Sequence, residues 1–374
     1  MKILHIVEAF TGGIFDIVMN MSNELAARGH KVTIVYSTRV NTPENLGSYF
    51  SNGIELRKMN MVRSISPLRD TLNLAKLVKT IKIENPDIVH LHSSKAGFIG
   101  RVAARICGLG KNVYYSPHDL AYTVSKGMKK HLYYLVERLG LVFGNNLIAC
   151  SKGEYDEIND RLTDNVKLLN NAIDNSLFNR VVIDYKGRYT SKNIATVGRL
   201  SEQKNPKLFL EIARKNRDYN FFWIGDGDYM KDELLRESNI TVTGWLKKDE
   251  LIAYLNSSFL YMQTSISEGM PIAVIEAQAV GLPCLVTDAV GNRDIISNDY
   301  NGYVLPFDAD MFNQKMAFLR GDKTIYFKLS YNSKENVYDN YLIDHYVDKL
   351  LDIYSIEDEE QHSHRHPVVA RRWA

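Results

Sequence analysis

Short apolar runs alternate with longer stretches of helical periodicity in both halves of the chain. Each apolar run has the length and composition of a strand that is buried on both faces. A polar stretch that ends in GRYTSKN separates two series of such runs. The runs expected to form strands are 2–7, 31–36, 87–92, 112–118 and 146–151, then 193–199, 219–225, 240–245, 259–265, 283–288 and 302–307.

This alternation predicts an α/β fold with two Rossmann-like domains, because repeated strand–helix–strand units form parallel sheets covered on both faces. We expect an N-terminal domain at 1–170, a linker at 171–190 and a C-terminal domain at 191–340. A helix at 341–357 should pack back towards the N-terminal domain, and 358–374 is expected to be a disordered or non-native tail. Ligands of parallel sheets bind beyond the carboxyl ends of the strands, so we expect a cleft between the domains.

The composition is that of a globular protein too long for one ordinary core. The chain has 374 residues, of which 45% are hydrophobic and 24% are charged. Cys107, Cys150 and Cys284 lack the spacing of metal ligands and are expected to be reduced core residues. No signal peptide opens the chain and no apolar stretch has membrane-spanning length, so we expect a cytoplasmic protein.

The charge is unevenly distributed, although the net charge is only +2. Residues 1–169 contain 22 Lys and Arg against 15 Asp and Glu, and the remaining residues contain 24 against 29. A basic first half favours an anionic partner, such as a membrane surface or a phosphorylated acceptor. Ordinary scatter of charges explains the difference equally well.

In the first half, polar or glycine residues follow three of the expected strands. Gly12 and Gly13 precede a helix expected at 15–28 and could cradle a phosphate, although a plain tight turn would look the same. His118 follows the fourth strand, where a structural role and a functional role are equally compatible with the sequence. At the start of another helix, hydroxyl groups and amides could hold an anion at Ser93, Ser94 and Lys95.

In the second half, cations and glycines follow the strands. Arg199 and Lys204 come after the first strand of this half and form a natural diphosphate clamp, although a solvated basic loop is an alternative. Gly225 follows the next strand, where a flat ligand could approach the backbone closely.

The segment SEGMPIAVIEAQAVGLP predicts a helix with a carboxylate just before it and another within it. Pro271 suits the first helical position, where its missing N–H costs nothing. Ile272, Ile275 and Ala279 recur at helical spacing and should face a core. Glu268 then stands beside free backbone amides, while Glu276 lies on the helix.

Two D-x-D triplets, 226–228 and 308–310, could hold a divalent cation. Arg199, Lys204 and the helix amides can supply the same positive charge without a metal, so we interpret both triplets as structural. Asp310 is expected to be the N-cap of the helix that follows it. No metal or other cofactor is therefore expected.

Several motifs together resemble the retaining GT-B glycosyltransferases of family 4. They are GRLSEQKN, GDGD, VTGW, HSSKAGFIGRVAAR, SPHDLAY, NNAIDNSLF and, above all, the E-x7-E pair of Glu268 and Glu276. The likeness extends to about Ile356. One departure is GGIFD, where Phe15 and Asp16 replace the basic or polar residues common in relatives.

The resemblance implies a role for each motif. Glu276 would bind the nucleotide ribose, and Glu268 with the backbone of Gly269, Met270, Pro271 and Ile272 would bind the donor sugar and phosphates. Arg199 and Lys204 would stabilise the diphosphate leaving group, and His118 would contact the donor sugar across the cleft. Gly244 and Trp245 match positions whose backbone receives the base. Transfer in this family proceeds with retention and without an obligatory metal.

Other classes of protein would need different residues in this sequence. A non-hydrolysing nucleotide-sugar 2-epimerase on the same fold would need acid–base carboxylates and histidines concentrated at the cleft. A nicotinamide-dependent oxidoreductase would need G-x-G-x-x-G after the first strand, and AFTGGIFD lacks it. A catalytically dead binding module is disfavoured because every expected motif is present.

The segment 126–144 predicts a helix with an apolar face and a basic, aromatic-rich start. A core helix is the commoner explanation, but interfacial helices have this pattern as well. With the basic first half, it leads us to expect a peripheral protein that acts on a lipid-linked glycan, as in bacterial surface-polysaccharide synthesis. Uridine diphosphate is the nucleotide we expect, with no nucleic-acid partner.

Overall fold

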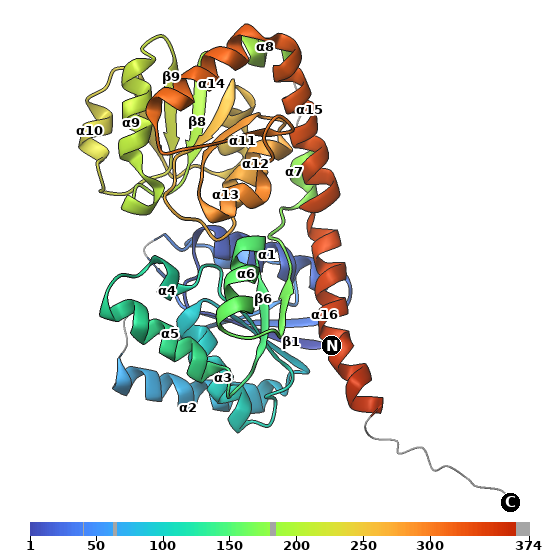
Figure 1. The fold of residues 1–374 in the computed structure, drawn as a ribbon. Coiled ribbons are helices and arrows are strands. Elements are labelled where there is room, and N and C mark those ends of the chain that lie inside the picture. The colour runs from blue at the N-terminus through green and yellow to red at the C-terminus, as the bar shows by residue number, and fades with distance from the viewer. Residues whose placement is uncertain (40, 63–65, 180–184, 364–374) are drawn as a thin grey trace, which may run out of the picture. The chain divides into compact units, whose positions relative to one another are not determined.

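The computed structural model describes residues 1–39, 41–62, 66–179 and 185–363. They form two compact units: unit 1 contains 1–149, 157–169 and the segment from 344 onward, and unit 2 contains 150–156 and 170–343. In each unit, helices cover both faces of one parallel sheet (Figure 1). The α/β architecture with two Rossmann-like domains, expected from the alternating pattern, is thereby confirmed.

The sheet of unit 1 has seven parallel strands in the order β3-β2-β1-β4-β5-β6-β7. The neighbouring strands β1 and β4 pair in parallel, with Ile3 opposite Ile88 at one end and Val7 opposite His92 at the other. Both are buried along almost their whole length, as strands covered by helices on both sides must be. The strands are β1 Lys2–Val7, β2 Lys31–Tyr36, β3 Glu55–Lys58, β4 Ile88–His92, β5 Val113–Ser116, β6 Asn146–Ala149 and β7 Val166–Leu168.

The last helix of the chain belongs to unit 1. In α16, the Tyr354 hydroxyl lies 2.8 Å from Nδ1 of His90 in a hydrogen bond, and Asp348 pairs with Arg28, the C-cap of α1. The helices of this unit are α1 Gly12–Ala27, α2 Pro67–Glu84, α3 Ser94–Ile106, α4 Ala121–Val124, α5 Met128–Gly140 and α16 Ile343–Ser363, with a 3-10 turn at Leu46–Tyr49. The helix α6, Lys152–Arg161, begins in unit 2 and ends in unit 1.

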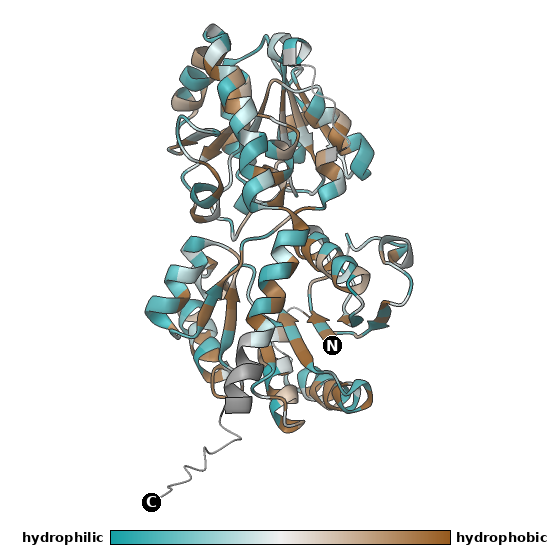
Figure 2. Cartoon of the chain, turned by 90° about the vertical axis from the view of Figure 1, so that its right-hand side faces the viewer, coloured by the Kyte–Doolittle hydropathy of each residue, from teal (hydrophilic) through white to brown (hydrophobic). Residues whose placement is uncertain are grey.

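The sheet of unit 2 has six parallel strands in the order β10-β9-β8-β11-β12-β13. These are β8 Asn193–Val197, β9 Asn220–Ile224, β10 Ile240–Gly244, β11 Leu260–Gln263, β12 Cys284–Thr287 and β13 Gly302–Leu305. The helices are α7 Asn175–Asn179, α8 Tyr185–Thr190, α9 Pro206–Lys215, α10 Lys231–Leu235, α11 Lys248–Asn256, α12 Ile272–Ala279, α13 Val290–Ile295, α14 Ala309–Gly321 and α15 Lys323–Asn340, with a 3-10 turn at Glu202–Lys204. Hydrophobic residues are concentrated in the strands of both sheets (Figure 2).

An aromatic core holds the helices of unit 2 against its sheet. Phe209 of α9 packs edge-on against Trp223 of β9, with ring centroids 5.1 Å apart. Phe259 stacks on Tyr326 of α15 at 4.9 Å, and the Arg320 guanidinium lies 3.7 Å from the Phe259 ring centroid. Such contacts add to the free energy gained by burying the rings.

The structure departs from the sequence expectations at several boundaries. The pattern did not predict β3 and β7, because ELRK is a polar edge strand and VKL is only three residues long. The first helix begins at Gly12 rather than residue 15, and α7 and α8 occupy much of the expected linker. The last helix runs to Ser363, so the expected tail starts as helix, and 364–374 lie outside the described residues.

Candidate functional site

The two central strands of the unit 2 sheet, β8 and β11, are neighbours, and the strand order reverses between them. Such a switch point in an α/β sheet opens a crevice at the carboxyl ends of the strands, where ligands bind. Arg199 and Lys204 follow β8, and Glu268 follows β11. The fold therefore brings predicted residues that are far apart in the sequence to the same edge of the sheet.

Lys204 and Glu268 form an ion pair, with Nζ 2.6 Å from Oε1. Both side chains are largely buried, with 20% and 8% of their surfaces exposed. The same carboxylate oxygen accepts a hydrogen bond from Nε2 of Gln263 at 2.8 Å, and Oε1 of Gln263 accepts one from the Tyr261 hydroxyl at 2.7 Å. Glu268 is thus held by a buried hydrogen-bonded network that starts on β11.

Arg199 differs from Lys204 in having no partner among the residues that the structure describes. Its side chain is exposed in the loop after β8, and within the described ranges no hydrogen bond or ion pair engages its guanidinium. A free guanidinium offers a planar set of donors that matches a phosphate. This loop therefore presents one uncommitted cation and one that is paired with a carboxylate.

The helix after Glu268 starts one residue later than expected. Pro271 is the N-cap of α12, with an extended ψ of 106°, so its placement at the first helical position was wrong. In the first turn of α12 the Val274 amide donates to the Pro271 carbonyl oxygen at 3.1 Å, so the amides of Ile272 and Ala273 are the ones that a ligand could use. Ile272, Ile275 and Ala279 are buried as expected, and most of the other side chains of α12 are buried with them.

The turn before α12 is braced by residues for which the sequence analysis predicted no role. Nδ2 of Asn171 donates to the Met270 carbonyl oxygen at 3.1 Å. The amide of Gly291 donates to the Glu268 carbonyl oxygen at 3.2 Å, and a Cβ at Gly291 would lie 2.4 Å from the Gly269 carbonyl oxygen. The glycine at 291 therefore allows α13 to approach the Glu268–Gly269 backbone.

Glu276 is buried in α12, with 5% of its surface exposed, and forms an ion pair with Lys248 at the start of α11. Sequence reasoning missed Lys248, which lies three residues after Trp245 in a lysine-rich turn that resembles any solvated loop. Trp245 itself is half exposed after β10, and Gly244 before it has the left-handed φ of 74° that favours glycine.

Gly225 has a packing role. A Cβ there would lie 2.2 Å from the Gly198 carbonyl oxygen, and φ is 142°. The Trp223 Nε1 donates to that same oxygen at 2.8 Å. The missing side chain thus lets the loops after β8 and β9 touch, which fixes the start of the segment that carries Arg199.

The two Asp triplets have internal partners. Asp226 pairs with Lys231 at 2.7 Å and accepts a hydrogen bond from the Gly227 amide, and both contacts hold its pKa below the usual range. Asp310 pairs with Lys215 at 2.5 Å. The N-cap of α14 is Asp308, which accepts from the Asp310 amide at 2.8 Å, so the assignment of that cap to Asp310 was wrong.

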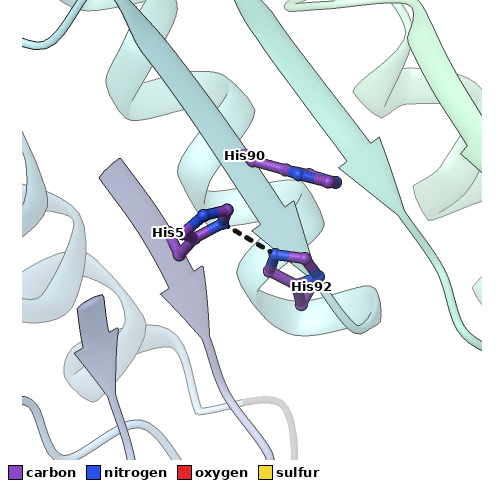
Figure 3. Close-up of side chains that lie close together, drawn as sticks. All are labelled: His5, His90 and His92. Atoms are coloured by element: carbon purple, nitrogen blue, oxygen red, sulfur yellow. Dashed lines mark hydrogen bonds between the residues drawn. The ribbon is translucent and has the colours of Figure 1, made fainter. Parts of the chain in front are cut away.

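In unit 1, a chain of imidazoles leads from the interior of the sheet to His118. His5 on β1 and His92 on β4 are fully buried, and their Nδ1 and Nε2 atoms lie 3.1 Å apart (Figure 3). The Nδ1 of His92 lies 3.0 Å from Nε2 of His118. Desolvation lowers the pKa of His5 to about 3 and that of His118 to about 4, so both are neutral at pH 7.

The backbone at His118 is strained. His118 and Asp119 have φ values of 57° and 113°, which non-glycine residues rarely adopt. Such residues cost of order 1–3 kcal/mol each and cluster at functional sites. This observation favours the functional interpretation of His118 over the structural one.

His5, His90 and His92 have one ring nitrogen each within 4.8 Å of one another, as metal ligands do. The nitrogens of His92 are already engaged with His5 and His118, and those of His90 with Ser116 at 2.9 Å and Tyr354. Only Nε2 of His5, among the nitrogens of these three residues, lacks a partner within the described residues. A bound cation would have to break these hydrogen bonds, so the cluster fits a buried polar network better than a metal site.

The remaining predicted residues of unit 1 lie at helix starts. Gly12 and Gly13 are exposed in the first turn of α1, and the φ of Gly12 is 56°. Lys95 pairs with Asp70 at 2.8 Å, so its charge already has an internal partner. Ser93 is the N-cap of α3, and Ser94 forms a hydrogen bond with the Tyr115 hydroxyl.

Two family models match the chain and together span most of it. The family described as Glycosyltransferase Family 4 matches residues 11–177, and Glycosyl transferases group 1 matches residues 185–336.

Individual proteins are similar over nearly the same length. The Escherichia coli UDP-Gal:alpha-D-GlcNAc-diphosphoundecaprenol alpha-1,3-galactosyltransferase is 30% identical over 79% of this chain and 81% of its own length. The Staphylococcus aureus capsular polysaccharide biosynthesis glycosyltransferase CapM is 23% identical over 77% and 83%. The structure of sucrose-phosphate synthase from Thermosynechococcus elongatus aligns with a TM-score of 0.80 at 16% identity, covering 96% of this chain and 100% of that one.

Proposed function

The chain belongs to glycosyltransferase family 4, and we propose that it transfers a sugar from a uridine diphosphate donor to a lipid-linked glycan with retention of configuration. It is a glycosyltransferase of polysaccharide synthesis that uses a nucleotide-sugar donor. Uridine diphosphate and a diphosphoundecaprenol-linked acceptor both occur in the name of the Escherichia coli relative, which supports these choices here.

The observation that carries the proposal is the cation pair after β8. Arg199 is exposed and uncommitted within the described part of the chain, while Lys204 is held by Glu268. A diphosphate leaving group gains negative charge at the transition state, and preorganised cations stabilise that charge most. Arg199 supplies a first contact, and Lys204 can exchange part of its interaction with Glu268 for a phosphate oxygen.

Glu268 and Glu276 have different tasks in this proposal. Glu268 accepts hydrogen bonds from the hydroxyl groups of the transferred sugar. The amides at the start of α12 face the phosphates of the nucleotide-sugar donor. Glu276 accepts hydrogen bonds from the ribose hydroxyls, with Lys248 holding its carboxylate in place. Gly244 and Trp245 receive the base through their backbone.

The transfer proceeds by attack on the face from which the leaving group departs. The bond from the anomeric carbon to the β-phosphate oxygen breaks, and a bond from that carbon to the acceptor oxygen forms. The proton of the acceptor hydroxyl passes to the departing phosphate oxygen, which yields the nucleoside diphosphate. Arg199, Lys204 and the amides of α12 stabilise the charge without a divalent metal, so activity should persist in excess chelator.

The epimerase alternative would keep both the sugar and the nucleotide on one molecule. The relatives reported above are transferases, not epimerases. Release of free uridine diphosphate only when acceptor is present would support transfer. Interconversion of the donor without any acceptor would instead support epimerisation.

The test of the donor site is a thermal-unfolding screen with uridine, guanosine and adenosine diphosphates. The uridine compound should raise the unfolding temperature most. Arg199→Ala should weaken its binding by about ten- to a hundredfold, because a charge-assisted hydrogen bond contributes roughly 1.5–3 kcal/mol. The matched control is Arg214→Ala, which removes an exposed arginine of α9 that pairs with Glu237. Equal affinities for the parent and Arg199→Ala would contradict the assignment.

A further inference from the structure

The helix α5 exposes an apolar stripe, whereas the residues that it buries are Glu137 and Gly140. Met128, Leu132, Leu135 and Leu139 recur at helical spacing, and Val142 continues the series just after the helix. All five are exposed, and Met128 exposes 90% of its surface. We call these five residues the apolar stripe of α5. A helix that served only the core would turn this stripe inward.

The orientation of α5 is fixed by buried polar contacts on its other side. Glu137 is buried and lies 3.0 Å from Nη2 of Arg101 on α3, while the Tyr115 hydroxyl donates to its other oxygen at 3.0 Å. Gly140 packs against the same guanidinium, since a Cβ at position 140 would lie only 2.3 Å from Nη2 of Arg101. Rolling α5 to bury the leucines would expose Arg101 and break these contacts. The apolar stripe is therefore a fixed feature of the folded unit.

The exposed charges on the segment that carries the stripe have one sign. The exposed residues Lys126, Lys129, Lys130 and Arg138 lie along the same segment, together with His131. Between residues 121 and 144 the sequence contains a single acid, Glu137, and that acid is buried against Arg101. An exposed apolar stripe flanked by the basic residues of its own segment is complementary to an apolar surface bordered by negative charge.

We propose that the apolar stripe of α5 and its basic border dock on the surface of an anionic lipid bilayer. The leucine side chains enter the region between headgroups and acyl chains, and the lysine ammonium groups contact the lipid phosphates. Within the described residues, no helix has the length and apolarity needed to cross a membrane. The contact is therefore with one surface. This inference extends the proposed function by naming where a lipid-linked acceptor would be met.

A second copy of the chain is a poorer partner for this face. A two-fold dimer places the same patch on both sides of the interface. The lysines and Arg138 of one copy would then lie against those of the other, and like charges brought together disfavour association. A bilayer with anionic headgroups has the opposite sign and no such conflict.

The test is sedimentation of the full chain with vesicles of phosphatidylglycerol and phosphatidylcholine, and with vesicles of phosphatidylcholine alone. The parent protein should sediment with the anionic vesicles at low salt and less at high salt, because salt screens the charges. Leu132→Ser, Leu135→Ser and Leu139→Ser combined should reduce binding at least tenfold. Leu235→Ser on α10 is the matched control, since Leu235 is 52% exposed and Leu135 is 54% exposed. This control should bind like the parent.

Charge is tested separately with Lys126→Gln and Lys129→Gln. Each lysine near an anionic surface contributes about fivefold in affinity, so the pair should lower binding about 25-fold at low salt and much less at high salt. A parent protein that stays in the supernatant, or a triple Leu→Ser variant that binds unchanged, overturns the proposal. A dimer in sedimentation velocity that the triple variant dissociates would assign the stripe to self-association and also overturns it.

The donor site provides the internal check. Every variant should retain the parent unfolding temperature and its protection by uridine diphosphate, which shows that the fold and unit 2 are intact. If a variant loses vesicle binding but is still stabilised by uridine diphosphate, the loss is due to the change in α5 alone. Absence of donor protection in the parent, with vesicle binding preserved, would contradict the proposed function and leave the docking surface standing.

Discussion

At the scale of single residues, the pairing of Glu268 and Glu276 with different lysines is the most informative feature of unit 2. The two carboxylates look equivalent in the sequence, but Lys204 comes from the loop after β8 and Lys248 from the start of α11. Each glutamate is mostly buried, and burying an unpaired carboxylate is costly. The lysines therefore compensate the buried charges and hold both carboxylates in place before a ligand arrives.

A prediction at this scale concerns Glu276. Glu276→Gln should lower affinity for uridine diphosphate about tenfold, because a neutral amide replaces a charge-assisted acceptor for the ribose. Lys248→Ala should have a smaller effect, since Lys248 is half exposed and screened by solvent. Isothermal titration calorimetry measures both, with the exposed Glu211→Gln of α9 as the control. A Lys248→Ala variant that binds worse than Glu276→Gln would show that the lysine itself contacts the nucleotide.

At the scale of elements, the contact between α3 and α5 depends on one buried ion pair. Arg101 and Glu137 expose 1% and 3% of their side chains, and Arg101 also lies over the Tyr115 ring at 4.6 Å. Charges buried in this way stabilise a fold only as a pair, because each alone would pay a large desolvation cost.

Replacing only one member of that pair should destabilise the fold more than replacing both members with apolar residues. Arg101→Met leaves Glu137 buried without its cation and should lower the free energy of unfolding by about 3–5 kcal/mol. Arg101→Met combined with Glu137→Leu should recover most of that loss. Urea denaturation followed by circular dichroism gives both values. If the double variant were no more stable than the single one, the pair would not be what holds α5 in place.

At the scale of the whole molecule, the two units should respond to different conditions. Unit 1 contains the buried histidines, whereas the proposed donor site lies in unit 2. Nucleotide binding should therefore stabilise unit 2, by mass action on its folded form alone. A fall in pH should lower the stability of unit 1.

The sign of the pH effect follows from the histidine pKa values. Burial lowers the pKa of His5 to about 3 and holds those of His90 and His92 well below 6.5, so these rings stay neutral in the folded state. The unfolded chain binds protons once the pH falls below about 6.5. Stability is therefore full above that pH and falls towards pH 3, by at most about 1.4 kcal/mol per pH unit for each such histidine.

Calorimetry of the full chain between pH 7.5 and 4.5 measures this slope. The transition of unit 1 should move to lower temperature as the pH falls, and His5→Phe should make the slope shallower, whatever it does to stability at pH 7.5. His131→Phe, at an exposed position of α5, should leave the slope unchanged. An unchanged slope in His5→Phe would mean that His5 is not among the groups that titrate on unfolding.

The sequence by itself determined the fold class, the family and the residues at the strand ends. Periodicity shows which runs are buried on both faces, and a parallel sheet then places the carboxyl ends of its strands on one edge. For this reason Arg199, Lys204 and Glu268 could be assigned to one site although more than sixty positions separate the first from the last.

Only the tertiary structure decided how those residues are paired and which way the helices face. No role was predicted for Asn171 or Lys248, because their partners, Met270 and Glu276, lie far from them in the sequence and no local pattern indicates such a contact. The edge strand ELRK was missed because its polar side chains carry no alternating signal. The spacing of the leucines in α5 is compatible with both a core helix and an interfacial helix. The leucines point to the surface because Glu137, on the opposite side of the helix, is buried against Arg101. Hydrophobic periodicity shows that a helix has an apolar face, whereas the packing of its other face determines where that face points.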